Sequence, residues 1–150
     1  MKIISTFSIV LMFISTSYGQ KFTLQDTVFN NGDVLISHDI RFDFNKATIR
    51  SENFPFLDSI ASFLLKNKNI AIEVSNHCDE RISDYYSTCL TCKRARAIAD
   101  YLVSKGVKAD RLIAKGYNAN KPLIKGAITE EEHQQNRRTE FKIIRTDYIE

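Results

Sequence analysis

The sequence predicts a two-layer α/β (α+β) sandwich in which helices pack on one mixed four-stranded sheet. Short segments of alternating apolar and polar residues are interspersed with two longer segments whose apolar residues recur at helical spacing. The expected order is β-α-β-α-β-(α)-β, and strands joined through long helices favour parallel neighbours with right-handed crossovers. With 150 residues, 43% hydrophobic and 26% charged, the chain has the size and composition of one globular domain.

The N-terminal segment differs in composition from the rest of the chain. Lys2 precedes an apolar run that is too short to span a bilayer comfortably, and Ser17 and Gly19 provide the small residues of a signal-peptidase site. We therefore expect residues 1–19 to be a cleaved signal peptide that directs export; the alternative is a retained membrane anchor. No later segment is apolar enough to cross a membrane, so we expect no transmembrane segment in the mature chain.

The first half of the mature chain is expected to contain an arm, a strand and a helix. Residues 20–33 have weak periodicity and predict an extended N-terminal arm. A strand is predicted within 39–49, because apolar residues alternate with polar ones at Ile40, Phe42 and Phe44. A helix is predicted at 51–67, with Ser51 as its N-cap. Its inner face comprises Leu57, Ile60, Ala61 and Leu64.

The second half is expected to hold the remaining strands and the longest helix. A buried strand at 69–75 is followed by a helix from about Ser83 to Lys105, capped by Ser83 or Asp84 and ended by Gly106 at the position after the C-cap. Strands are predicted at 111–118 and 138–145, with a short helical turn at 130–136 between them. The domain so defined spans 34–146 and leaves a tail at 147–150.

One arginine in the long helix lies on a predominantly apolar stripe. Arg94 lies one turn after Leu90 and one turn before Ile98. A guanidinium is always charged and is rarely buried without a partner. Asp79, in the loop before the helix, is the nearest candidate in sequence. The pair predicts either a structural salt bridge or a binding site for a zwitterion, whose ammonium would contact Asp79 and whose carboxylate would contact Arg94.

Several motifs in a fixed order resemble those of the OmpA-like (OmpA/Pal/MotB) peptidoglycan-binding domain family. They cover about residues 34–146 and comprise Phe42-Asp43-Phe44-Asn45-Lys46, His77-Cys78-Asp79, Leu90-Thr91 with Arg94-Ala95, "YLVSKGV", "RLIAKGY" and Asn136-Arg137-Arg138. The resemblance implies the sandwich fold and a non-enzymatic protein without a cofactor. It also implies a periplasmic location at the cell wall or outer membrane, with outer-membrane proteins as further partners.

The resemblance further implies a ligand and a set of contacts. The family binds the peptide stem of peptidoglycan non-covalently through diaminopimelate, whose far end carries an amino and a carboxyl group. Asp79 would contact the ammonium and Arg94 the carboxylate, with Asn45, Ser87 and Arg138 as further binding or bracing residues. The loop departs from the family pattern, because Asn76 and Ile82 stand where glycines are usual. This departure restricts a loop that must turn sharply.

Three cysteines leave an alternative open. Cys78, Cys89 and Cys92 all follow the expected signal peptide, and an exported chain can form disulfides. We expect a structural disulfide, either Cys89 with Cys92 or Cys78 with one of them. The alternative function is a thiol-redox or zinc protein that uses the three cysteines with His77. Nucleic acid is not an expected partner, because the formal charge is only +3 and the basic residues alternate with acidic ones.

Overall fold

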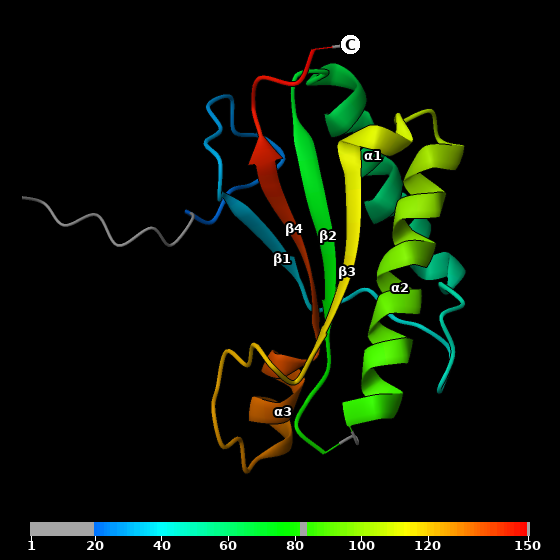
Figure 1. Cartoon of the computed structure of the whole chain (residues 1–150), viewed down its shortest axis with the longest axis vertical. Helices are drawn as coiled ribbons and strands as arrows, with labels where there is room; N and C mark the ends of the chain where they lie inside the picture. The colour runs from blue at the N-terminus through cyan, green and yellow to red at the C-terminus, as the bar shows by residue number, and fades with distance from the viewer. Residues whose placement is uncertain (1–19, 82–83, 150) are drawn as a thin grey trace, which may run out of the picture.

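The computed structural model describes residues 20–81 and 84–149, and for residues 84–89 it gives the helical backbone alone (Figure 1). The strands are β1 (Val34–Ser37), β2 (Ala71–His77), β3 (Leu112–Asn118) and β4 (Arg138–Arg145). The helices are α1 (Phe54–Lys66), α2 (Asp84–Ser104) and α3 (Glu130–Asn136), with short 3-10 turns at Ser51–Asn53 and Ala109–Arg111. The predicted signal peptide lies outside the described residues.

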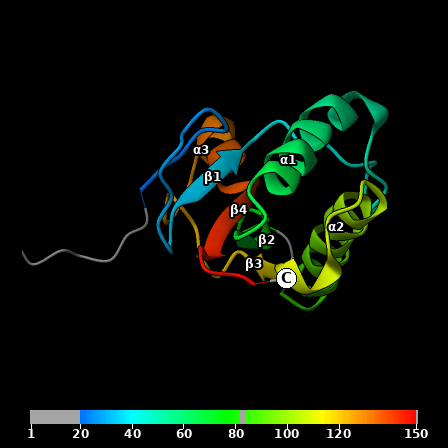
Figure 2. The same ribbon diagram turned by 90° about the horizontal axis from the view of Figure 1, so that it is seen from above.

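The four strands form one mixed sheet, which confirms the predicted fold class. Their order is β1-β4-β2-β3, with β2 and β3 parallel and with β4 antiparallel to both of its neighbours. Helices α1 and α2 cover one face of this sheet, as the view from above shows (Figure 2). Helix α3 lies near the end of the sheet at which β2 finishes (Figure 1). In the part of the chain that the structure describes, no helix is long and apolar enough to span a membrane.

The core lies between the sheet and the two long helices. All four residues predicted for the inner face of α1 are buried, and Ile72 and Val74 of β2 meet them from the sheet. From α2, Ile98 and Leu102 complete this core. Gly106 ends α2 with φ of +98°, a left-handed conformation that glycine adopts at little cost and that confirms the predicted end of the helix.

The predicted first strand is wrong. The strand β1 is the apolar segment Val34–Ser37, whereas residues 39–49 form a loop with one isolated bridge between Phe42 and Ile49. Ile40 and Phe42 do pack against the core, as the alternation predicted, but Phe44 is 87% exposed. Two inward side chains followed by a turn therefore produced the alternating pattern of a strand.

Two further expectations in the first half need correction. The segment 20–33 is not an extended arm: Phe22 is buried, and its ring and that of Phe29 both pack against Phe63 of α1. Ser51 does not cap α1, because it begins the 3-10 turn that precedes the helix, and Asn53 occupies the N-cap position. The apolar residues of the 20–33 segment therefore form part of the core and do not extend into solvent.

A buried arginine from the turn before β3 binds carbonyl groups at the end of α1. Arg111 is 2% exposed. Its guanidinium donates hydrogen bonds to the carbonyls of Leu64 and Asn67 at the end of α1, at 2.8 and 2.7 Å, and to the carbonyl of Ile70 at 2.8 Å. Carbonyls at the end of a helix lack partners within the helix. Arg111 therefore joins the end of α1 to the start of β2.

We expect Arg111→Lys to lower the free energy of unfolding by about 1–2 kcal/mol. A lysine keeps the charge but cannot reproduce the planar fork that reaches three carbonyls at once. Urea unfolding measures the change, with the exposed Lys108→Arg as the control for exchanging the two basic residues. Equal midpoints for Arg111→Lys and the wild type would contradict this structural role.

Candidate functional site

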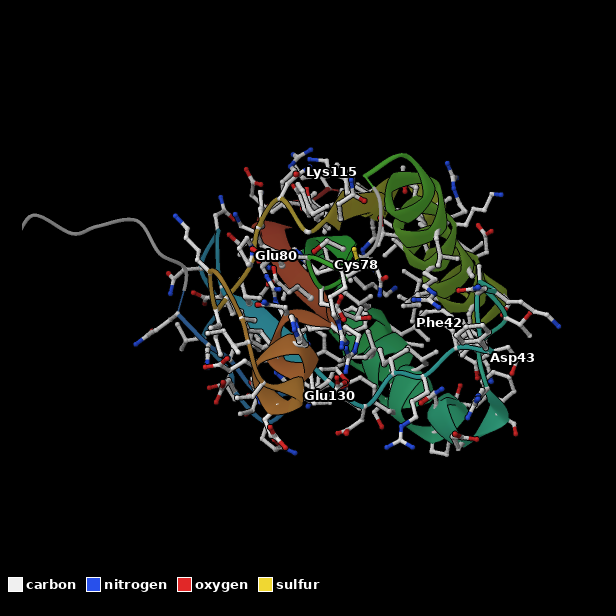
Figure 3. All side chains as sticks on the ribbon, turned by 90° about the horizontal axis from the view of Figure 1, so that it is seen from below. Phe42, Asp43, Cys78, Glu80, Lys115 and Glu130 are labelled. Atoms are coloured by element: carbon white, nitrogen blue, oxygen red, sulfur yellow. The ribbon has the colours of Figure 1, made fainter. Side chains whose placement is uncertain are left out.

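A cavity of about 570 Å³ lies where β2 ends, between the 38–42 segment, α2 and the start of β4. Five arginines line it: Arg41, Arg50, Arg94, Arg137 and Arg138. Cys78, the residue after β2, lies near the centre of the view along this end of the molecule, and Phe42 and Glu130 of α3 lie on different sides of it (Figure 3). The end of one strand therefore brings together segments that are far apart in the sequence.

Carboxylates pair with Arg50, Arg137 and Arg138. Arg50 Nε lies 3.5 Å from Asp43, Arg138 Nε donates to Glu140 at 2.7 Å, and Arg137 donates to Asp79. The cavity remains a donor-rich site, because a guanidinium carries five N–H groups and one carboxylate does not use them all. Such a wall favours a ligand with carboxylates, which arginine can bind through two parallel hydrogen bonds.

Asp79 is held by two arginines, neither of which is the predicted partner Arg94. It is 3% exposed and accepts hydrogen bonds from Arg81 Nη2 at 3.0 Å, from the Arg81 backbone at 3.0 Å, and from Arg137 Nη1. Burial raises the pKa of Asp79, but the hydrogen bonds from Arg81 and Arg137 outweigh it and hold the pKa at about 2. Asp79 is therefore ionised at neutral pH and fixes Arg137, which lines the cavity.

Glu130, the first residue of α3, extends this arrangement into a network of four charges. It pairs with Arg81 at 2.9 Å and with Arg137. The pKa of Glu130 is lowered by the hydrogen bonds from these two arginines. Because Arg81 follows β2 and Glu130 begins α3, the network ties the β2–α2 loop to the other side of the cavity. Sequence analysis missed Arg81, Arg137 and Glu130, although Arg137 stood in the Asn136-Arg137-Arg138 motif.

Arg94 lines the cavity from α2, but it lies at the margin of the buried stripe of the helix. The stripe is centred on Ala95, Ile98 and Leu102, and Arg94 is only partly buried. Its Nε donates to the carbonyl of Lys46 at 3.0 Å, and its guanidinium lies 4.9 Å from the centre of the Phe42 ring. Arg94 thus fastens the 43–48 turn to α2, as well as facing the cavity.

The other predicted site residues fall into different surroundings. Asn45 is exposed on the 43–48 turn, with φ of +54°, and it is not among the residues that line the cavity; Arg94 holds this turn through the Lys46 carbonyl. Arg138 is 5% exposed and donates to Glu140, to the carbonyl of Asn136 and to that of Lys121. Its role toward a ligand stays a prediction. The side chain of Ser87 lies outside the described residues.

The cysteines do not form the predicted disulfides of Cys78 and Cys92. Both stand as thiols, Cys78 buried beside the cavity and Cys92 exposed on α2. A helix holds Cβ atoms three residues apart at about 5–6 Å, which is longer than a disulfide between Cys89 and Cys92 requires. Among the described residues, no three His, Cys, Asp or Glu side chains gather as a metal site. The side chain of Cys89 is not among those described.

His77, the last residue of β2, contributes a further polar group to the cavity. His77 is buried, stacks on Tyr117, and places Nε2 3.3 Å from Ser75 Oγ and 3.6 Å from Glu140. Burial lowers the pKa of His77, so that its ring is neutral at pH 7. Glu140 is ionised, because hydrogen bonding to His77 and the charge of Arg138 outweigh its burial and lower its pKa to about 2.

Comparison with known proteins identifies relatives for most of this chain. The sequence model of the OmpA family matches residues 41–137. A peptidoglycan-associated lipoprotein from Rhizobium meliloti is 39% identical over 83 residues, which are 55% of this chain and 44% of the relative. An outer membrane protein A from Escherichia fergusonii is 38% identical over 76 residues, which are 49% of this chain and 31% of the relative. The chain therefore matches less than half the length of these curated relatives.

Solved structures show the same arrangement of strands and helices. The cell wall anchor of the T6SS from Pseudomonas aeruginosa is 30% identical, with a TM-score of 0.65 over 75% of this chain and 80% of the other. The peptidoglycan-associated lipoprotein from Burkholderia pseudomallei is 27% identical, with a TM-score of 0.62 over 69% of this chain and 87% of the other. The residues 41–137 that match the family model reach from the loop after β1 to the residue before β4, and they include β2, α2 and α3.

Proposed function

Because this chain belongs to the OmpA family, we propose that it binds peptidoglycan non-covalently, without catalysing a reaction, in the arginine-lined cavity. The observation that carries the proposal is the convergence of five arginines on one cavity at the end of β2. Peptidoglycan stem peptides carry free carboxylates, which guanidinium groups recognise. Two relatives that are named a peptidoglycan-associated lipoprotein and a cell wall anchor support this function.

Within the stem peptide, diaminopimelate is the residue that we propose as the main contact. Its far end carries a carboxylate next to an amino group. Arg94 is the proposed partner of the carboxylate, because its guanidinium lines the cavity and is positioned by Phe42 and the Lys46 carbonyl. Asp79 is the proposed partner of the amino group and also keeps Arg137 in place, Arg138 is a proposed brace, and Asn45 and Ser87 are proposed as further contacts.

The proposed setting is the cell envelope. Export through residues 1–19 would place the mature chain in the periplasm, where it could reach the cell wall, and outer-membrane proteins are proposed as further partners. The thiol or zinc alternative has no support from the described residues, since Cys78 is buried beside the cavity whereas Cys92 is exposed on α2. No second function is therefore proposed.

We expect Arg94→Gln to bind purified sacculi at least about tenfold more weakly than the wild type, because a charge-assisted hydrogen bond contributes about 1.5–3 kcal/mol. Co-sedimentation with sacculi at several protein concentrations measures the apparent Kd. Arg96→Gln is the matched control, because Arg96 is exposed on the same helix and the substitution removes the same charge. If the two variants, both folded by circular dichroism, sediment alike, Arg94 does not bind the ligand.

A further inference from the structure

Asp33, the residue directly before β1, is a buried acid whose hydrogen-bond donors are backbone groups. It is 5% exposed, and its Oδ2 accepts a hydrogen bond from the backbone N–H of Asn30 at 2.8 Å. Its Oδ1 accepts from the backbone nitrogen of Gln20 at 3.2 Å. Among the side chains that the structure describes, no Lys, Arg or His forms an ion pair with Asp33. Because a buried carboxylate is costly unless a cation pairs with it, this acid calls for a positive partner.

The backbone of Asp33 fixes the direction of its carboxylate. Its N–H donates to the carbonyl of Asn30 at 3.1 Å, which closes a tight turn. Its carbonyl accepts from the N–H of Ile143 in β4 at 2.8 Å, and the N–H of Gly32 donates to the carbonyl of Ile143 at 2.8 Å. The turn is therefore fastened to the sheet, and the carboxylate is held facing the nitrogen of Gln20.

The segment that begins at Gln20 lies along the free side of β1. β1 is an edge strand, since the order of the sheet is β1-β4-β2-β3. The carbonyl of Gln20 accepts from the N–H of Val34 at 2.9 Å, and the N–H of Phe22 donates to the carbonyl of Val34 at 3.2 Å. Lys21 forms a parallel bridge with Val34. Contacts of Gln20 and of the residues after it thus place the Gln20 nitrogen beside Asp33.

Removal of residues 1–19 would change the chemistry of this contact. In the uncleaved chain the nitrogen of Gln20 belongs to a peptide bond and is neutral. Hydrolysis of the Gly19–Gln20 bond adds water across it, so that Gly19 gains a carboxylate and Gln20 gains an amino group. An α-amino group has an ordinary pKa of about 8 and is mostly protonated at neutral pH. The nitrogen that faces Asp33 would then carry the positive charge that the buried carboxylate lacks.

We propose that Asp33 is the receptor for the amino terminus of a mature chain that begins at Gln20. The inference rests on the export proposed for residues 1–19 and is independent of peptidoglycan binding. It also decides between the two interpretations of that segment. A retained anchor would leave Asp33 facing a neutral peptide nitrogen, whereas cleavage after Gly19 supplies its ion partner. Cleavage even one residue later would remove Gln20, and with it the donor to Asp33 and the acceptor for Val34.

The ion pair would fix the free end of the chain against the edge of the sheet. From that end, the segment 20–33 continues to Phe22 and Phe29, whose rings pack against Phe63 of α1. The backbone contacts with Val34 cover part of the free side of β1. Uncovered edge strands can pair with other chains and promote aggregation. A terminus that is bound to Asp33 therefore protects this edge, and it does so only after cleavage.

A cycle that removes the charge on each side tests the pairing. The mature chain 20–150 is compared with a chain that keeps residues 17–19, in which the Gln20 nitrogen remains a neutral peptide nitrogen. In urea at about pH 6, we expect the mature chain to have an unfolding equilibrium constant at least about fivefold smaller. Asp33→Asn should bring the two chains within about twofold of each other. Asp26→Asn is the matched control and should keep the difference, because Asp26 accepts a backbone N–H of the same segment at 2.7 Å whereas the Gln20 nitrogen donates to Asp33.

The reactivity of the amino terminus gives a second measurement. An N-terminal glutamine cyclises when its unprotonated amino nitrogen attacks the carbon of its own side-chain amide; the amide C–N bond breaks, a lactam forms and ammonia leaves with the proton of the amine. Protonation removes the attacking lone pair, so the ion pair with Asp33 should slow the reaction. We expect the mature wild type to lose ammonia at least about threefold more slowly than Asp33→Asn, as measured by intact-mass spectrometry over time.

The outcomes separate this inference from the proposed function. Equal stability of the mature and the extended wild-type chains would overturn it, and this comparison needs no substitution if Asp33→Asn does not fold. A difference that Asp33→Asn leaves unchanged would also overturn it, because the amino group would then have another partner. The full chain, expressed and exported in a bacterium, should yield a product that begins at Gln20, and a product that keeps residues 1–19 or begins elsewhere would contradict the inference. Binding to sacculi is measured separately, so the proposed function stands or fails on its own.

Discussion

Gly116→Ala is expected to lower the free energy of unfolding by about 3 kcal/mol or more, a large share of the stability of a domain of this size. Gly116 lies in β3 directly under α2. A Cβ atom at this position would lie 2.3 Å from the backbone nitrogen of Cys92 and 2.7 Å from the carbonyl carbon of Thr91. Both are backbone atoms of a helix, so the whole of α2 would have to move away from the sheet.

Thermal and urea unfolding of Gly116→Ala measure this effect, and Gly126→Asn is the control. At Gly126 an added Cβ meets nothing within 4 Å, and asparagine tolerates its φ of +64°. Adding Thr91→Ala to Gly116→Ala should not restore stability, because it removes the Thr91 hydroxyl at 2.4 Å but leaves both backbone contacts. A Gly116→Ala protein as stable as the wild type would contradict this close packing of helix on strand.

This close packing also bears on binding. Arg94 lies on α2 just after the segment that Gly116 contacts, and it holds the 43–48 turn through the Lys46 carbonyl. A helix displaced from β3 would move the Arg94 guanidinium away from the cavity. Any Gly116→Ala protein that remains folded should therefore bind sacculi less tightly than its remaining stability alone would predict.

The parts of the fold that the sequence predicted correctly depend on interactions local to each element. The inner face of α1 and the end of α2 at Gly106 follow from helical periodicity and from the conformational freedom of glycine. The first strand was wrong because Ile40 and Phe42 face the core from a loop, which gives the same alternation as a strand. Only the pairing of Val34–Ser37 with β4, more than a hundred residues away, separates the two cases.

The candidate site was predicted only in part, because its contacts also join segments that are far apart in the sequence. Asp79 and Arg94 were singled out from a charge in an apolar stripe, and the structure places Arg94 on the cavity wall. The ion partners of Asp79 could not be assigned, because Arg137 reaches it only when α3 and β4 are in place. The sequence also does not tell that Arg137, just before β4, and Arg138, its first residue, both line the cavity. The hydrogen bond from Asn76 to Thr139 likewise depends on the register of β2 with β4.

Asp79→Asn is expected to lower the free energy of unfolding by about 2 kcal/mol at pH 7. The folded-state pKa of Asp79 is about 2, below its ordinary value of 3.8, and one pH unit of difference corresponds to about 1.4 kcal/mol. Asp79 is buried, so solvent screens its hydrogen bonds with Arg81 and Arg137 only weakly. The side chain of Arg81 is half exposed. Asparagine has the same shape but cannot form an ion pair with either arginine.

The pH dependence gives this prediction its sharpest form. A carboxylate with a lowered folded-state pKa stabilises the protein above its unfolded pKa, and the contribution disappears as the pH falls through the folded value. The difference in stability between the wild type and Asp79→Asn should therefore be full above about pH 5 and should close between pH 4 and pH 2. Urea unfolding at each pH measures it, with the exposed Glu131→Gln as the charge-matched control. A difference that persists at pH 2 would show that Asp79 stabilises the loop by its shape and not by its charge, and Arg137 would then be positioned by Glu130 and Gln134 alone.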